Sequence, residues 1–259
     1  MNATADRSRT DSLDALDSLD AAPPALLDNV LHAVGLADEY APWPSPVGDV
    51  FVAWNARGIS CLSLAGPDPT EFESYFRTRV RRPLRVGDGP PSRVRAALDR
   101  RLSGKSGPTF ADLRIVTPFE RDVLECTARI PAGEARPYGW VAREIGRPGA
   151  VRAVGTALKH NPVPLLIPCH RVVRSDGRIG EYALGGPGNK RLLLTLEGVP
   201  VDDLEPVKGF VGSDTTHIFC LPWCRYDRKV SEVHRVSFRN QAEAEAAGYR
   251  PCKHCRPVA

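Results

Sequence analysis

The sequence predicts an α+β protein that consists of a small sheet domain, a mainly helical domain and a small cysteine-rich module near the C-terminal end. Three observations support this prediction. Apolar residues alternate around a tight connection near residue 56, helix-capping signals with glycine and proline stops follow residue 117, and four of the seven cysteines lie between positions 220 and 255. With 259 residues and 24 prolines, the chain is long enough for two or three domains.

Residues 1–44 are predicted to be a mostly disordered leader with one short helix. The first 24 residues are rich in Asp, Ser and Ala and lack the apolar core of a secretory signal. A short helix is expected over residues 25–34, ended by Gly35. The chain contains no run of eighteen apolar residues, so we expect no membrane span. The odd number of cysteines argues for a reducing compartment, and we expect a cytoplasmic protein.

Residues 45–113 are predicted to form the small sheet domain. Apolar side chains alternate at Val50, Val52 and Trp54, and a second apolar run follows a short connection, which is typical of a β-hairpin. The rest of the domain is expected to contain, in order, a helix that begins near residue 70, a helix over residues 92–102 and a strand over residues 110–116 that closes the sheet. No residues typical of catalysis stand out in this part.

Residues 114–198 are predicted to form the mainly helical domain. Thr117 and Glu120 make a capping box around a proline at the first helical position, so a helix begins there. Two short helices follow, over residues 138–145 and over about 149–160, joined by glycine and proline.

The last of these helices has a polar, basic face formed by Arg152, Thr156 and Lys159. Two short helices of which the second is basic are typical of a helix-turn-helix, which binds DNA. A plain αα-hairpin is the alternative on this evidence alone.

The distribution of charge is more informative than the net charge of +4. Residues 1–40 contain 2 basic and 8 acidic side chains, residues 114–198 contain 13 and 8, and residues 213–259 contain 8 and 5. Two positive modules behind an acidic leader favour a nucleic-acid partner. A slightly basic solvated surface would give similar numbers.

The most informative motif is Pro168-Cys169-His170-Arg171, which follows an apolar run and two prolines. Neighbouring side chains of an extended strand point to opposite faces, so Cys169 and His170 can cooperate only if the chain turns there. A thiol is a nucleophile as its thiolate, and a nearby imidazole lowers its pKa. A buried cysteine beside a core histidine is the alternative.

Residues 161–173 closely resemble the active-site signature of the O6-alkylguanine-DNA alkyltransferases, and the resemblance continues in good register over residues 117–198. It implies DNA repair in which Cys169 accepts an alkyl group from guanine O6 of duplex DNA. Sulfur is the soft nucleophile that such a displacement at carbon needs. No protein group readily cleaves the resulting thioether, so a single turnover is expected. No organic cofactor is expected, and the protein is expected to act as a monomer.

The resemblance also implies roles for other residues. His170 takes the proton of Cys169 through a water, Glu197 orients the imidazole, and Asn161 fixes the turn that presents the thiol. Tyr138 donates a hydrogen bond to the departing guanine. In the minor groove, Arg152 replaces the base that is rotated out of the stack. The expected DNA contacts are those of Arg152, Thr156, Lys159 and Arg171.

Two rival functions remain on the sequence. A zinc-containing DNA-binding regulator or alkylation sensor would use Cys169 without repair turnover, and a cysteine hydrolase would release an acyl group with water. The presence of Cys169 argues against the related alkyltransferase-like proteins, which have tryptophan at this position. The loop between Tyr182 and Lys190 is one residue longer than in the relatives, which affects the rim of the base pocket.

Residues 213–259 form the C-terminal module, separated by a linker over residues 199–212. Cys220 and Cys224 are followed after 27 residues by Cys252 and Cys255, a spacing that predicts a four-thiolate Zn²⁺ site. A redox pair or two disulfides are the alternatives.

The module resembles the metal-binding repair domain of the bacterial adaptive-response protein Ada, for example in the run Tyr249-Arg250-Pro251-Cys252-Lys253. The resemblance implies that Cys220 is both a zinc ligand and a methyl acceptor from phosphotriesters of the DNA backbone. A zinc finger that is only structural is the alternative. No regulatory helix-turn-helix of the Ada kind follows the module, so transcription activation is not expected.

Overall fold

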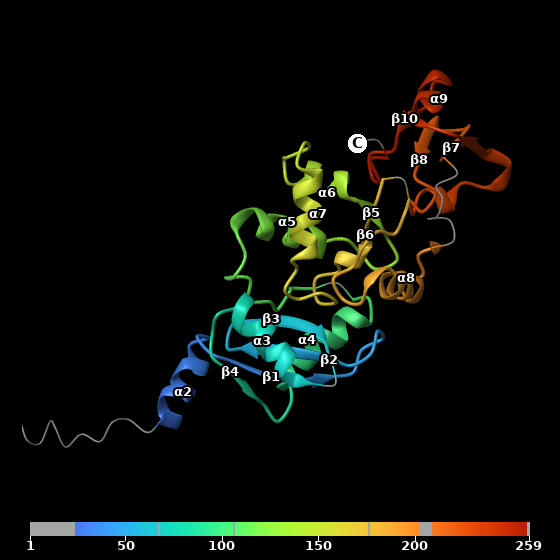
Figure 1. Cartoon of the computed structure of the whole chain (residues 1–259). Coiled ribbons are helices and arrows are strands. Elements are labelled where there is room, and N and C mark those ends of the chain that lie inside the picture. Colours follow the sequence, from blue (N-terminus) through green and yellow to red (C-terminus); the bar gives the residue numbers. More distant parts are fainter. Residues whose placement is uncertain (1–23, 67, 106, 176, 202–208, 258–259) are drawn as a thin grey trace, which may run out of the picture.

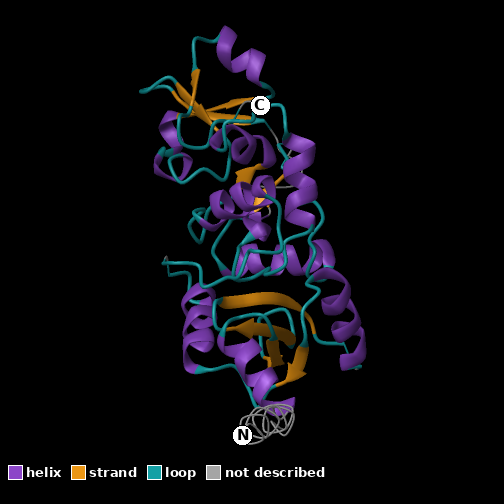
Figure 2. Ribbon diagram, turned by 90° about the vertical axis from the view of Figure 1, so that its left-hand side faces the viewer, coloured by secondary structure: helices purple, strands orange, loops and turns teal. Residues whose placement is uncertain are grey.

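The computed structural model describes residues 24–257 with the exception of 67, 106, 176 and 202–208. It shows three parts stacked in an elongated column, with the N-terminal sheet at one end and the C-terminal module at the other (Figures 1 and 2). The predicted disorder of residues 1–23 lies outside the described residues. The short helix is present as α2 (Pro24–Ala33). Among the helices that the structure describes, none has the length and apolar character that crossing a bilayer requires.

The N-terminal domain is built on a sheet of four strands in the order β3-β2-β1-β4. The predicted hairpin is confirmed, since β2 (Val50–Asn55) pairs antiparallel with β3 (Gly58–Leu64). The helices α3 (Pro69–Arg79) and α4 (Ser92–Leu102) are also found where they were predicted. The remaining strands are β1 (Asp38–Trp43), antiparallel to β2, and β4 (Leu84–Val86), parallel to β1.

Two predictions for this domain are wrong. Strand β1 lies within the residues assigned to the leader, and residues 110–116 form no strand but only an isolated bridge between Ala111 and Ile59. The reason is a buried ionic network that apolar periodicity cannot reveal. Arg82 Nε lies 2.7 Å from the buried carboxylate of Asp38 on β1, and Arg82 Nη1 lies 2.9 Å from that of Asp112. Buried carboxylates are retained only when paired in this way.

The middle domain contains three helices packed on one another and a two-stranded parallel sheet. The capping box is confirmed at the start of α5 (Pro118–Ala128). Helices α6 (Tyr138–Glu144) and α7 (Val151–Lys159) form the helix-turn-helix pair and pack on α5. Strand β5 (Arg136–Pro137) immediately precedes α6 and pairs with β6 (Val172–Val173), which immediately follows the 3-10 turn η1 (Cys169–Arg171). Helix α8 (Gly186–Leu196) completes the domain.

The C-terminal module has its own sheet, in the order β10-β8-β7-β9. Its strands are β7 (Phe210–Ser213), β8 (Ile218–Cys220), β9 (Arg235–Phe238) and β10 (Arg250–Pro251), with two 3-10 turns η3 (Asp227–Lys229) and η4 (Glu232–His234) and the helix α9 (Gln241–Ala246) between them. The predicted linker over 199–212 is therefore too long. At the far end of the predicted linker, strand β7 already begins at Phe210. At its near end, Val199 and Val201 are buried.

Candidate active site and metal centre

The thiol of Cys169 is presented by a turn that Asn161 holds. The amide of Asn161 donates a hydrogen bond to Ile167 O at 3.0 Å and lies 3.2 Å from Cys169 Sγ. Its own oxygen accepts a hydrogen bond from the backbone of Val163 at 3.1 Å. Leu165 adopts the left-handed region, with φ of 70°, within the same turn. Asn161 thus contacts the sulfur directly, in addition to supporting the turn.

His170 and Glu197 form a pair behind the thiol. His170 Nε2 lies 3.0 Å from Glu197 Oε1, and both groups are largely buried. The other ring nitrogen, Nδ1, is buried and has no hydrogen-bond partner among the described residues. Burial lowers the pKa of His170, although Glu197 opposes this shift, so the neutral imidazole is favoured as a proton acceptor. Burial alone would raise the pKa of Glu197, but His170 and Arg171 outweigh it and hold this pKa at about 2.

Arg171 does not contact solvent where DNA could reach it, which corrects the sequence prediction of a DNA contact. Its side chain is 2% exposed and makes two hydrogen bonds to the Glu197 carboxylate, of 2.8 Å from Nε and 2.6 Å from Nη2. The third nitrogen, Nη1, donates to Ile130 O at 2.6 Å. The planar guanidinium fits a carboxylate in this bidentate way, so Arg171 fixes Glu197 and, through it, the imidazole.

Lys190 is a site residue that the sequence reasoning missed. It is fully buried, and its ammonium donates hydrogen bonds to Val172 O at 2.6 Å and Glu181 O at 3.3 Å. Burial lowers its pKa to about 8, while the charge of Cys169 opposes the shift. Lys190 belongs to α8, and Glu197 directly follows the last residue of that helix. The two are seven residues apart, a spacing that places them on one helical face. That spacing is the signal that could have identified Lys190.

The pKa of Cys169 results from opposing effects. Complete burial raises the pKa of the thiol, whereas the hydrogen bond from Asn161 and the positive charge of Lys190 lower it. The cysteine is therefore a thiol at rest, surrounded by groups that favour the thiolate once a proton acceptor is in reach.

Cys169 opens into a cavity of about 500 Å³ between α7 and the loop that precedes α8. This volume is within the range of small-molecule pockets. The lining residues are Tyr138, Gly155, Leu158, Lys159, Cys169, Glu181, Tyr182 and Ala183. The Tyr138 ring also lies over the ammonium of Lys190, with 5.7 Å between nitrogen and ring centroid. The segment of residues 182–185, which directly precedes α8, thus supplies two of the lining residues.

The residues predicted to contact DNA on α7 are exposed beside this cavity. Arg152, Thr156 and Lys159 all face solvent, while Val154 and Leu158 are buried on the opposite side. Val151, the first residue of α7, is 36% exposed. Helix α7 therefore presents its basic face outward and contributes Lys159 to the mouth of the cavity.

The four predicted metal-ligating cysteines meet in the C-terminal module. The sulfur atoms of Cys220, Cys224, Cys252 and Cys255 all lie within 4.8 Å of one another, and all four residues are buried. Parallel pairing of β8 with β10 brings the two cysteine pairs together. Four thiolates that each lie about 2.3 Å from a shared Zn²⁺ are within this distance of one another, so the donor set and the arrangement fit tetrahedral zinc.

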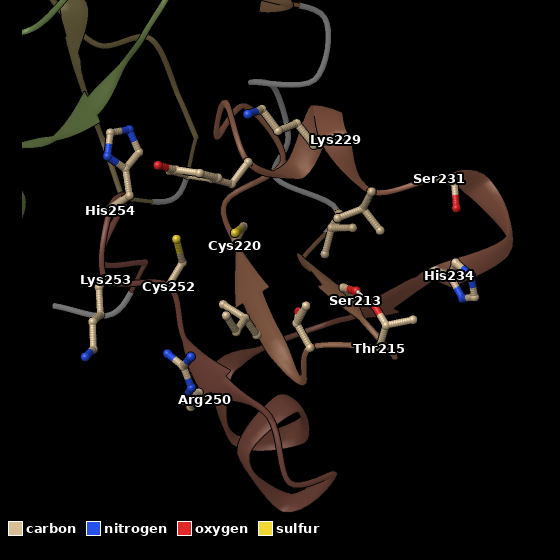
Figure 3. Close-up of a pocket in the computed structure, with 15 residues that line it drawn as sticks. Ser213, Thr215, Cys220, Lys229, Ser231, His234, Arg250, Cys252, Lys253 and His254 are labelled. Carbon is tan, nitrogen blue, oxygen red and sulfur yellow. Dashed lines mark hydrogen bonds between the residues drawn. The ribbon is translucent and has the colours of Figure 1, made fainter.

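A second cavity, of about 520 Å³, lies beside the cysteine cluster (Figure 3). Cys220 and Cys252 line it, whereas Cys224 and Cys255 do not. The cavity is also lined by the cationic side chains of Lys229, Arg250 and Lys253 and by the hydroxyl side chains of Ser213, Thr215, Thr216 and Ser231. A cavity that combines sulfur atoms with cationic and hydroxyl side chains is suited to a nucleic-acid backbone.

Comparison with known proteins gives two family models that match separate parts of the chain. Residues 118–199 match the DNA binding domain of 6-O-methylguanine DNA methyltransferase, and residues 207–258 match the metal binding domain of Ada. The second match begins within the predicted linker, in agreement with the position of β7.

Similar full-length proteins cover the first two domains. The methylated-DNA–protein-cysteine methyltransferase of Mycolicibacterium paratuberculosis is 36% identical over 144 residues, which are 54% of this chain and 87% of the relative. That of Methanosarcina barkeri is 36% identical over 164 residues, 59% of this chain and 92% of the relative. The crystal structure of Mycobacterium tuberculosis OGT in complex with DNA has a TM-score of 0.50 and 33% identity, covering 61% of this chain and 92% of that one. The chain therefore belongs to the methylated-DNA–protein-cysteine methyltransferase family and carries an Ada-type metal-binding domain behind the methyltransferase domains.

Proposed function

We propose that the protein repairs O6-alkylguanine in duplex DNA by a single, irreversible transfer of the alkyl group to Cys169. The observation that carries this proposal is the position of the Cys169 thiol. It opens into the 500 Å³ cavity, held by Asn161 and backed by His170 and Glu197. A merely structural cysteine has no need of this arrangement.

The reaction follows from the groups around the thiol. His170 Nδ1 accepts the proton of Cys169 through a water, and Glu197 stabilises the imidazolium that forms. The sulfur attacks the alkyl carbon, a C–S bond forms, and the C–O6 bond breaks with its electron pair moving onto the guanine. The Tyr138 hydroxyl, whose pKa is raised by burial, stays protonated and donates a hydrogen bond to that guanine. No described residue of the cavity is placed to cleave a thioether, so the protein is consumed.

Access to the base requires its rotation out of the duplex. Arg152 and Thr156 are exposed on α7, and Lys159 stands at the cavity mouth. We infer that α7 enters the minor groove, that Arg152 fills the gap in the stack, and that the extruded base enters the cavity. The cavity is lined by residues of one chain, which supports action as a monomer, and the seven free cysteines support a reducing compartment such as the cytoplasm.

The C-terminal module is proposed to hold one Zn²⁺ through its four cysteines and to accept methyl groups from backbone phosphotriesters at Cys220. Zinc would keep the sulfur atoms as thiolates, and the cationic cavity beside them supports contact with the DNA backbone. Cys252 lines the same cavity, so the choice of Cys220 rests on the Ada resemblance. A module that only anchors the chain on DNA is the second candidate.

The test of the main proposal is intact-mass spectrometry after incubation with a duplex that contains one O6-methylguanine, followed by peptide mapping. We expect one methyl per chain, on Cys169, and no adduct from this substrate in Cys169→Ala. A full-yield adduct in the variant would contradict the assignment. Release of product with recovery of the unmodified protein would favour a hydrolase, and binding without any adduct would favour a regulator.

A further inference from the structure

The C-terminal module and the middle domain share one hydrophobic cluster. From the middle domain, Ala135, Val173 and Leu194 are completely buried in it, and from the module Leu221, Trp223 and Cys224 are buried to the same degree. Ala135 directly precedes β5, and Val173 belongs to β6. The module is thus packed on the two-stranded sheet of the middle domain (Figure 1).

A polar network ties the module to the start of β5. His254, which lies between two of the zinc cysteines, places Nε2 at 2.6 Å from Arg136 Nη2 and 3.1 Å from Glu134 Oε2. Arg225 Nη1 lies 3.3 Å from the other oxygen of Glu134. Glu134 and Arg136 also form an ion pair with each other and are less than 10% exposed. Removing a partner from a buried ionic network is costly, so these contacts hold the two parts together.

A second polar contact ties the module to the end of α6. Arg256 Nη1 lies 2.6 Å from Glu144 Oε1, and Arg143 Nη2 donates to Arg256 O at 2.8 Å. Residues 134–144 are therefore attached to the module at both ends. Between these attachments lies Tyr138, which forms a wall of the cavity that contains Cys169.

We propose that the zinc module is a positioning element of the alkylguanine site: by holding residues 134–144 at both ends it sets the position of Tyr138 and α6 against Cys169. This inference rests on the proposed function of Cys169. It gives the module a role that needs neither methyl transfer to Cys220 nor contact with DNA.

The geometry explains how docking reaches the thiol. Strand β5 leads directly into Tyr138 and pairs with β6, which follows the turn of Cys169. A displacement of β5 therefore moves the wall of the cavity relative to the sulfur. Shifts of about 1 Å in a positioning group can reduce a rate by up to two orders of magnitude.

The experiment removes each attachment in the full-length zinc-loaded protein and measures the rate of Cys169 alkylation by free O6-benzylguanine, which needs no DNA contact. Glu144→Ala and Arg256→Ala each remove the Arg256–Glu144 ion pair from one of its two sides, and His254→Ala removes the histidine contacts to Glu134 and Arg136. Exposed side chains of the module serve as controls. Arg239→Ala removes an arginine whose ion pair among the described residues is with Glu243, and His217→Ala removes a histidine whose ring contacts Tyr249.

We expect Glu144→Ala and Arg256→Ala to slow the reaction by about threefold to tenfold, with no further loss in the double variant, because both remove one contact. His254→Ala should have a similar effect, and the controls should react at the wild-type rate. In the slowed variants, amide hydrogen exchange over residues 134–144 should become faster while the zinc content stays unchanged. Because Glu144 lies outside the module, its variant decides the result even if a substitution near the metal releases zinc.

Unchanged rates and unchanged exchange in Glu144→Ala and Arg256→Ala would overturn the inference. The proposed function fails in a different way, since the wild-type protein would then acquire no adduct at Cys169 from either substrate. The exchange measurement would still report whether the module holds residues 134–144.

Discussion

Cys169 and Cys220 are two buried cysteines that each border a cavity of about 500 Å³, but their surroundings differ in kind. Cys169 is a single thiol. Burial favours its neutral form, whereas Asn161 and Lys190 favour its thiolate. Cys220 is one of four clustered sulfur atoms that fit a divalent metal. One site needs a proton acceptor at the moment of reaction, whereas the other would depend on a bound cation. The proposed chemistry thus reaches a reactive sulfur by two physical routes in one chain.

The largest difference between Cys169 and Cys220 should appear when the metal is removed. DNA with methylphosphotriesters should add a methyl to Cys220 in the Cys169→Ala protein. A chelator should abolish this transfer, because a free thiol is mostly protonated at neutral pH and we expect a small four-cysteine module to need its metal to fold. Peptide mapping after mass spectrometry checks the position of the adduct.

Cys224, Cys252 and Cys255 should remain unmodified in that experiment. A methyl on Cys252 would move the acceptor to the other sulfur that lines the cavity. If the zinc-loaded Cys169→Ala protein gains no mass at all, the module only anchors or positions.

Loss of the proton acceptor His170 should affect only the reaction of Cys169. His170→Ala should slow alkylation of Cys169 by O6-benzylguanine by about 10²-fold or more, the usual contribution of a general base. Transfer to Cys220 should be unchanged. His32→Ala, which removes a histidine from α2, is the matched control. A rate within a factor of about two of wild type would rule out His170 as the base.

A substitution on α7 should slow the reaction with duplex DNA but not the reaction with a free base. Arg152→Ala should slow repair of O6-methylguanine in duplex DNA by about tenfold or more, because the extruded base loses its replacement in the stack. The reaction with free O6-benzylguanine should hardly change. Arg95→Ala, at an exposed arginine of α4, is the control. Equal losses on both substrates would identify Arg152 as a structural residue.

A further effect concerns stability and pH. The pKa of Lys190 is lowered by burial to about 8 in the folded protein, so between about pH 8 and pH 10.5 the unfolded chain binds more protons than the folded one. The free energy of unfolding should therefore rise with pH through this window, by up to about 3 kcal/mol from this group. Denaturant unfolding with reductant should show this rise in the wild type and in Lys105→Met, but not in Lys190→Met. Parallel pH profiles in all three proteins would contradict the lowered pKa.

Local signals in the sequence identified most of the helices and the hairpin. The Thr117–Glu120 capping box is a contact between neighbours in the chain, and the spacing of the four cysteines reflects a single local module. Both could be read directly, because the residues that interact are the residues that form the pattern.

Long-range pairing explains what the sequence did not reveal. Arg171 was predicted to contact DNA, but it is buried and pairs with Glu197, which lies 26 residues further along the chain. The same applies to Asp38, which pairs with Arg82 and makes β1 part of the sheet despite its polar sequence. The site roles of Asn161, Tyr138 and Arg152 stay predictions until they are tested by substitution.

The parallel pairing of β5 with β6 has a consequence for the order of folding. Arg136 pairs with Val172, and the chain between them contains both α6 and α7. Closing this loop costs entropy that only the completed ladder and core repay, so the turn of Cys169 is expected to settle late. A growing or partly folded chain cannot assemble the acceptor without the helices that recognise DNA. A protein that can act only once therefore does not acquire its reactive sulfur before it can find its target.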